Sequence, residues 1–164
     1  MKNTNYQRIV LKKLRLAEAE DFFHLHDYPA IFGKYIQELN MEEEETALAF
    51  TKRLLWLTEG IYTIRLSTDP QLIIGSALIY RGGESKNEFH FGGTTLPAYQ
   101  GRGILLNAFD QIIELSKYCY NIPEVKVFLN VASNQASSTM SKLGFVSKQN
   151  NLLYSKRLRH KTMA

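Results

Sequence analysis

The order of the predicted elements between residues 88 and 132 is the feature that most constrains this fold. An apolar, β-prone segment (88–96) is followed by a helical pattern (103–118) and then by a second apolar segment (125–132). Apolar residues recur on one face of the helical segment, which is typical of an amphipathic helix. A strand, a helix and a strand in this order predict a β-α-β crossover, in which the two strands are parallel and the connection is right-handed.

Two helices are predicted in the first half of the chain, after an opening strand (6–14). The second is expected to start after Asn40, with Glu43 completing a capping box, the acidic residues 42–45 in the first turn, and Gly60 ending the helix. The apolar stripe of the first helix comprises Ala19, Phe22, Phe23 and His26, and that of the second comprises Ala47, Phe50, Leu54 and Leu57.

The other segments predict antiparallel strands. The segments 61–67 and 71–80 are joined at an Asp69-Pro70 turn and lead into the strand at 88–96. A short helix (134–145) then precedes a final hairpin (145–158), which is expected to turn at Asn150-Asn151. The predicted fold is therefore of the α/β class, α+β-like, with a mixed, mostly antiparallel sheet and helices on its faces. A single domain over residues 1–164 is expected, because the chain has no repeat or long linker.

Composition excludes several classes of protein. Apolar residues make up 45% of the 164 residues, but no run approaches the ~20 residues of a membrane span. The N-terminal residues contain no apolar signal core. The single cysteine, Cys119, rules out an intramolecular disulfide framework and fits a reducing compartment, so a cytoplasmic protein is expected.

The stretch "QGRG" (Gln100–Gly103) lies between the predicted strand and helix of the crossover. A helix start has unpaired backbone N–H groups, glycines let an anion approach them, and Arg102 adds a positive charge. The pattern is neither a P-loop nor a dinucleotide fingerprint, since Leu106 stands where the latter needs glycine. From these residues alone, a phosphate-binding loop and a plain tight turn both remain open.

The stretch "YQGRGILLNAF" resembles the acyl-CoA pyrophosphate loop of the GNAT N-acetyltransferase superfamily, whose pattern is Q/R-x-x-G-x-G/A. Gln100 and Gly103 match this pattern, and Leu105 departs from its small last residue. Residues 8–158 resemble the branch that contains the ribosomal-protein N-terminal acetyltransferases, with "NQASSTMSKLGF" similar to that branch's N-x-x-S segment.

The resemblance implies a single-domain GNAT-like fold whose central strands splay apart. It also implies direct transfer of an acetyl group from acetyl-CoA, as co-substrate, to a primary amine of a protein N-terminus or a small molecule. The cofactor-binding residues that it implies are Thr94, Thr95, Leu96, Gln100, Gly101, Arg102, Gly103, Ile104, Leu105 and Asn134. No metal is expected, because the four histidines and Cys119 show no ligand spacing.

The catalytic candidates are His90, Glu88 and Ser137. An ammonium must lose a proton before it attacks, and His90 is favoured as the base because an imidazole is already neutral near pH 7. Glu88 on the same strand face competes with it, a water wire is a third route, and a packed or surface histidine is the structural alternative. Gly92-Gly93 predicts a bulge or a close approach by another group. Many relatives carry a tyrosine as the leaving-group acid where this chain has Met140 or Ser141, and Ser137 is a candidate to replace it.

Two other functions compete with the enzyme. The first is a GNAT-fold module that binds acyl-CoA without turnover. The second is a small basic nucleic-acid-binding domain, suggested by the net charge of +4, but the chain has no recognisable nucleic-acid motif. The expected partners are therefore acetyl-CoA and an amine acceptor, without a membrane. The sequence is silent on the oligomeric state.

Overall fold

The computed structural model describes residues 8–27, 45–82, 88–100, 102–120, 122–128, 134–149 and 153–158. The strands are β1 (Ile9–Lys13), β2 (Thr58–Leu66), β3 (Gly75–Gly82), β4 (Glu88–Thr95), β5 (Glu124–Phe128), β6 (Val146–Gln149) and β7 (Leu153–Arg157). The helices are α1 (Ala19–His24), α2 (Ala47–Leu57), α3 (Ile104–Tyr118) and α4 (Asn134–Lys142), with 3-10 turns η1 (Leu16–Glu18), η2 (Leu25–Asp27) and η4 (Pro97–Tyr99).

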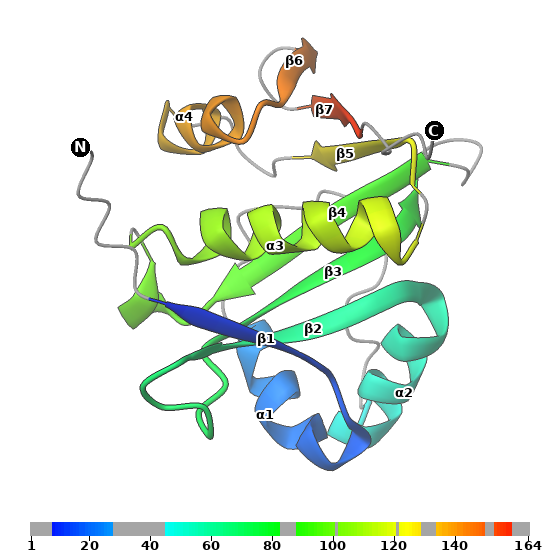
Figure 1. The fold of residues 1–164 in the computed structure, drawn as a ribbon. Coiled ribbons are helices and arrows are strands. Elements are labelled where there is room, and N and C mark those ends of the chain that lie inside the picture. Colours follow the sequence, from blue (N-terminus) through cyan, green and yellow to red (C-terminus); the bar gives the residue numbers. More distant parts are fainter. Residues whose placement is uncertain are drawn as a thin grey trace.

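The strands form one seven-stranded sheet in the order β1-β2-β3-β4-β5-β7-β6. Neighbouring strands are antiparallel, except for β4 and β5, which are parallel and are connected through α3 (Figure 1). The mixed, mostly antiparallel sheet and its parallel crossover are thus confirmed. None of the described helices is long and apolar enough to cross a membrane.

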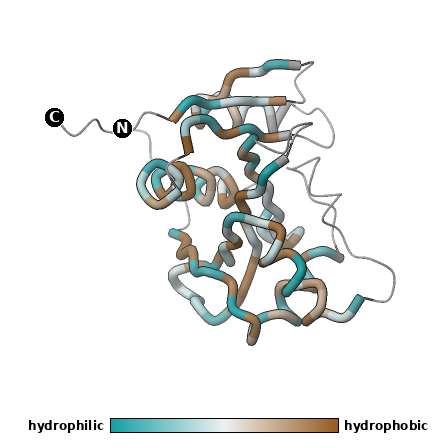
Figure 2. Tube along the Cα trace, turned by 90° about the vertical axis from the view of Figure 1, so that its right-hand side faces the viewer, coloured by the Kyte–Doolittle hydropathy of each residue, from teal (hydrophilic) through white to brown (hydrophobic). Residues whose placement is uncertain are grey.

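Helices cover both faces of the sheet, as the side chains of β3 illustrate. Ala77 and Ile79 belong to a core shared with α3 and α4, whereas Leu78 and Tyr80 belong to a second core shared with α1 and α2. Successive side chains of a strand point to opposite faces, so a central strand can supply both cores. In the turned view of Figure 2, α3 is seen end-on on one side of the sheet, and α1 and α2 lie on the other.

The start of α2 differs from the prediction. The helix begins at Ala47, because Thr46 has an extended backbone (φ −75°, ψ 159°) and its side chain accepts a hydrogen bond from the Ala49 N–H (3.1 Å). A helix running on from Asn40 is therefore wrong, although Asn40 itself and residues 41–44 lie outside the described residues. Threonine and asparagine both cap helices, so the sequence contained two competing start signals.

The residues around α2 also differ from their predicted roles. Glu45 precedes the helix instead of joining its first turn, and its carboxylate pairs with Arg53 at 2.8 Å. The helix ends at Leu57, which is exposed, and Gly60 lies inside β2 beside a register shift. The capping glycine was not needed, because Thr58 already leaves the helix with an extended backbone.

The strands β4 and β5 part after a short paired region. Only Phe89 with Val125 and His90 with Lys126 are in register, although β5 continues to Phe128 and β4 to Thr95. In Figure 1 the two ribbons lie close at the right and diverge toward the N-terminus of α3. The predicted splay of the central strands is confirmed. Residues 129–132 of the predicted strand and the turn at Asn150-Asn151 lie outside the described residues.

Candidate active site

The register of β4 places two of the three catalytic candidates, Glu88 and His90, on one face. β4 pairs with β3 without a shift, from Gly75 opposite Thr95 to Gly82 opposite Glu88. Glu88, His90 and Thr94 therefore share the face that carries Tyr80 and packs toward α1 and α2, as predicted. The bulge predicted at Gly92-Gly93 is absent from this pairing, so that part of the prediction is wrong.

The other predicted reason for the glycines, a close approach, is present at Gly93. A Cβ atom there would lie 3.1 Å from Leu105 Cδ2 and 3.1 Å from the Ser76 carbonyl oxygen. The close group is thus a side chain of α3. This packing also explains why leucine is tolerated at position 105, where related loops have a small residue: its side chain is buried against β4, so that only its backbone can face a ligand.

A chain of three polar side chains lies where β4 and β5 are still paired. Lys126 Nζ donates to Glu88 Oε1 (2.7 Å), and the second carboxylate oxygen of Glu88 lies 3.2 Å from His90 Nε2. The His90 ring is fully buried and stacks on Tyr80, with ring centroids 5.5 Å apart. Full burial excludes the surface-histidine alternative.

The electrostatics of this chain favour a charged Glu88 and a neutral His90. The hydrogen bond from Lys126 lowers the pKa of Glu88, and partial burial opposes this only in part. Burial lowers the pKa of His90, and the neighbouring Glu88 carboxylate offsets only part of that effect. Because an ionised carboxylate can only accept, His90 donates through Nε2–H, and its lone pair lies on Nδ1.

The loop before α3 has the features that anion binding requires. Gly103 has a left-handed backbone (φ 72°), and no side chain caps the helix that begins at Ile104. The first N–H groups of any α-helix have no intrahelical partner, and in α3 no capping side chain supplies one. Arg102 is exposed, with its guanidinium 5.5 Å from the centre of the Tyr99 ring. Gly101 lies outside the described residues.

The remaining predicted cofactor residues lie at the end of β4. Gln100 Nε2 donates to the Thr95 carbonyl (3.3 Å), which fixes the loop to the strand. Leu96 donates its backbone N–H to the Ile74 carbonyl (2.8 Å). Thr94 Oγ1 is buried and has no hydrogen-bond partner among the described residues. Such a group usually has a partner, so its position fits a polar ligand.

Helix α4 carries the last two candidates. Asn134 is its first residue, and its side chain lies outside the described part. Ser137 Oγ accepts a hydrogen bond from the Tyr154 hydroxyl (3.0 Å), which comes from β7. Of the two candidates for the position where relatives carry a tyrosine, Met140 is buried in the core and Ser141 is exposed. Sequence reasoning missed Tyr154 and Lys126, because no local pattern links either one to its partner.

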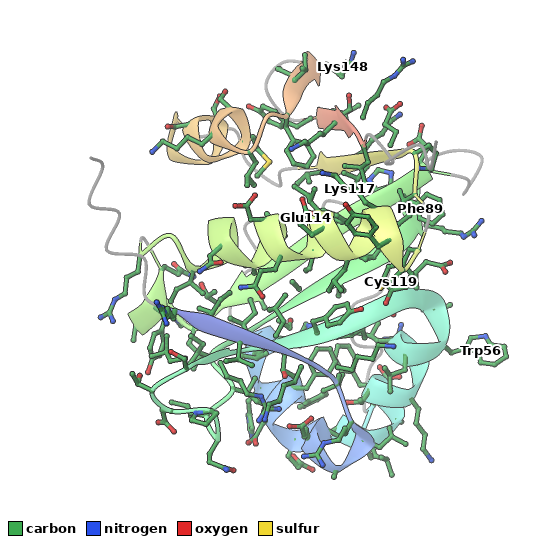
Figure 3. The ribbon with its side chains drawn as sticks, in the orientation of Figure 1. Trp56, Phe89, Glu114, Lys117, Cys119 and Lys148 are labelled. Atoms are coloured by element: carbon green, nitrogen blue, oxygen red, sulfur yellow. The ribbon has the colours of Figure 1, made fainter. Side chains whose placement is uncertain are left out.

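A groove of about 560 Å³ lies apart from these residues, between α3 and β1. It is lined by Leu11, Lys13, Tyr62, Gln111, Glu114, Leu115, Tyr118 and Cys119. Figure 3 shows Glu114 and Cys119 on α3 and just after it, whereas Glu88 and His90 lie on the face of β4 that carries Tyr80 and packs toward α1 and α2. None of the predicted site residues lines this groove.

The sequence matches the acetyltransferase (GNAT) domain family over residues 8–146. The chain belongs to the GNAT acetyltransferase family. Its fold is similar to that of a Vibrio cholerae spermidine N-acetyltransferase in complex with CoA and spermine (TM-score 0.68, 14% identity, 94% of this chain and 97% of that chain). It is also similar to ribosomal-protein-S5-alanine acetyltransferase from Vibrio fischeri (TM-score 0.66, 16% identity, 94% and 95%). No curated protein matches the sequence.

Membership of the GNAT family explains the parted strands and the uncapped helix start as parts of one fold. At 14% and 16% identity, the similar structures show that fold alone. Among the described residues of this GNAT domain, no group of three or more His, Cys, Asp or Glu side chains could hold a metal ion.

Proposed function

We propose that this GNAT protein transfers an acetyl group from acetyl-CoA directly to a primary amine. One observation carries the proposal: β4 and β5 part between an uncapped helix start and the Glu88–His90 pair. The uncapped helix start suits a phosphate-bearing donor, and the Glu88–His90 pair suits an amine that must lose a proton.

The donor would be held at the end of β4 and the start of α3. The backbone N–H groups of Gly103, Ile104 and Leu105 would bind the pyrophosphate, with Arg102 adding charge. The buried Thr94 hydroxyl would bind a polar group of the pantetheine arm. Acetyl-CoA supplies a thioester, which is an activated acyl group. The β4 backbone beyond His90 has N–H groups that could stabilise an oxyanion.

The acceptor amine would be deprotonated by His90. In its neutral form the ring can take a proton at Nδ1, while Glu88 accepts the hydrogen bond from Nε2. The low pKa of Glu88 makes the carboxylate itself a weak base near pH 7, which favours His90 over Glu88 in this role.

The leaving thiolate would be protonated on the α4 side. Ser137 accepts from the Tyr154 hydroxyl, so the single hydroxyl hydrogen of Ser137 is directed elsewhere. We assign this hydrogen to the sulfur. As it moves to the thiolate, the hydroxyl proton of Tyr154 would pass to the Ser137 oxygen along their hydrogen bond, so that no serine alkoxide is left. This arrangement would replace the tyrosine that relatives carry on the helix.

The acceptor is a protein N-terminus or a small-molecule amine. Both classes occur among the similar structures, one of which is a spermidine acetyltransferase and another a ribosomal-protein alanine acetyltransferase.

The test is a panel of amines and peptide N-termini, scored by release of free CoA thiol from acetyl-CoA. Turnover with at least one acceptor supports the proposal. Tight CoA binding without turnover across the panel would instead favour a non-catalytic acyl-CoA-binding module. Salt-dependent oligonucleotide binding without CoA binding would favour the nucleic-acid domain.

A further inference from the structure

Lys126 takes no part in the proposed transfer steps, yet it lies directly opposite His90 in the β4–β5 register. We propose that Lys126 is a positioning residue, which acts through Glu88 to fix the ring nitrogen of His90 that carries the proton. The tautomer of His90 is inferred from the contacts in the structure alone. The effect of that tautomer on catalysis rests on the proposed function.

The geometry divides the two oxygens of Glu88 between two donors. Oε1 accepts from Lys126 Nζ (2.7 Å), and Oε2 is left for His90 Nε2 (3.2 Å). A carboxylate held on one side by an ammonium has a defined rotamer and stays ionised. His90 must then present N–H at Nε2, which leaves its lone pair at Nδ1.

Among the described residues, Lys126 and His90 are the hydrogen-bond partners of the Glu88 carboxylate, so the loss of Lys126 would leave only the contact with His90. The Glu88 side chain is 36% exposed and Lys126 is 23% exposed, so water could replace the ammonium. The Glu88 charge would then act on His90 without a balancing cation, and the protonated imidazole would become more stable. Lys126 therefore keeps His90 in the neutral state that a base requires.

Among the residues that the structure describes, Glu88 and Lys126 are charged groups that act on His90. From β3, the Tyr80 ring stacks on the imidazole without a charge. The turn η2 packs against β4 and carries the titratable residue His26. Its Nδ1 lies 3.0 Å from the Phe22 carbonyl oxygen.

The proposal predicts shifts of opposite sign for the two partners. Lys126→Met removes a cation and should raise the pKa of His90 by about half a unit to one unit. Glu88→Gln removes an anion and leaves Lys126 nearby, so it should lower the pKa of His90 by a similar amount. A general loss of stability would not produce opposite shifts.

The experiment is a ¹⁵N NMR titration of the histidine rings, which reports both the tautomer and the pKa without turnover. The chain has four histidines, and the signal of His90 is assigned by its loss in His90→Gln. Lys126→Arg should retain the parent values. Lys148→Met, at an exposed lysine of β6, is the matched control (Figure 3). The acid limb of kcat/KM for one amine is measured on the same variants.

Opposite NMR shifts, an Nε2–H tautomer in the parent and an acid limb that moves with the NMR values support the proposal. An unchanged His90 titration in folded Lys126→Met overturns it, and so does an Nδ1–H tautomer in the parent. An acid limb that stays in place while the NMR values move also overturns it. If the parent acetylates no amine, the proposed function fails, whereas opposite NMR shifts still support the Lys126–Glu88–His90 linkage.

Discussion

The two ends of the seam between β4 and β5 carry different chemistry. At the closed end, where the strands still pair, Glu88, His90 and Lys126 form a chain of titratable side chains. At the open end, the described groups proposed to bind the donor are the Thr94 hydroxyl, the backbone around Gly103 and the Arg102 guanidinium, none of which titrates near neutral pH. Backbone N–H groups do not titrate, whereas the imidazole does so near neutral pH.

This difference separates two kinds of effect. Changes at the closed end should alter the pH dependence of the reaction and leave the affinity for acetyl-CoA intact. Changes at the open end should alter that affinity and leave the pH dependence intact. A closed-end variant that changes the affinity for acetyl-CoA, or an open-end variant that changes the pH dependence, would contradict this comparison.

The largest effect is expected at the closed end. His90→Ala should lower kcat/KM by about 100-fold near pH 7, because it removes the proposed base. Its pKa lies below the usual 6.5, so the parent rate should fall as acid protonates the ring, and this acid limb should vanish in the variant. The measurement is a pH–rate profile together with acetyl-CoA calorimetry, which should show no change.

Two further variants serve as controls for His90→Ala. His24→Ala, at an exposed histidine of α1, should keep the parent profile. His90→Gln retains most of the side-chain volume and separates loss of the base from a cavity effect. A profile for His90→Ala with the parent's shape and height would remove His90 from the mechanism.

The next effect belongs to the open end. Gly103→Asp should weaken acetyl-CoA binding by about tenfold or more, since a carboxylate there repels the phosphates. Gly103→Asn is the matched control, because asparagine has a similar size and also tolerates a left-handed backbone. Calorimetry should show the larger loss in the aspartate variant. Equal losses in the two variants would point to backbone strain and not to charge.

A smaller effect is expected where α3 packs on the open half of β4. Gly93→Ala should lower the free energy of unfolding by about 1 kcal/mol or more, because its methyl group meets Leu105 and a backbone oxygen. Leu105→Ala makes room, so the double variant should lose less stability than the sum of the single losses. Denaturant unfolding measures all three, and strict additivity would contradict the contact.

The smallest effect is expected at Thr94. Thr94→Val keeps the shape of the side chain and removes one hydroxyl, which should weaken acetyl-CoA binding about two- to fivefold. The pH profile should stay as in the parent, since no titratable group is lost. Tighter binding of acetyl-CoA by the valine variant would show that the hydroxyl faces no polar group of the donor.

The sequence predicted the fold better than it predicted the site. The strands, the crossover and the shared face of Glu88 and His90 followed from spacing, which local sterics make reliable. The start of α2 was wrong, because Asn40 and Thr46 both offered caps and only packing chose between them. For Gly92-Gly93, the pattern allowed a bulge or a close contact, and the answer depended on α3.

By itself, the sequence determined the order of the elements, the family and the position of the loop before α3, because each follows from local patterns and from their order along the chain. Only the tertiary structure decided the contacts between distant residues. Lys126 meets Glu88 across 38 positions, and Tyr154 meets Ser137 across 17. Such pairs depend on which strands become neighbours and where their pairing stops, since a parallel strand is reached only through its crossover helix.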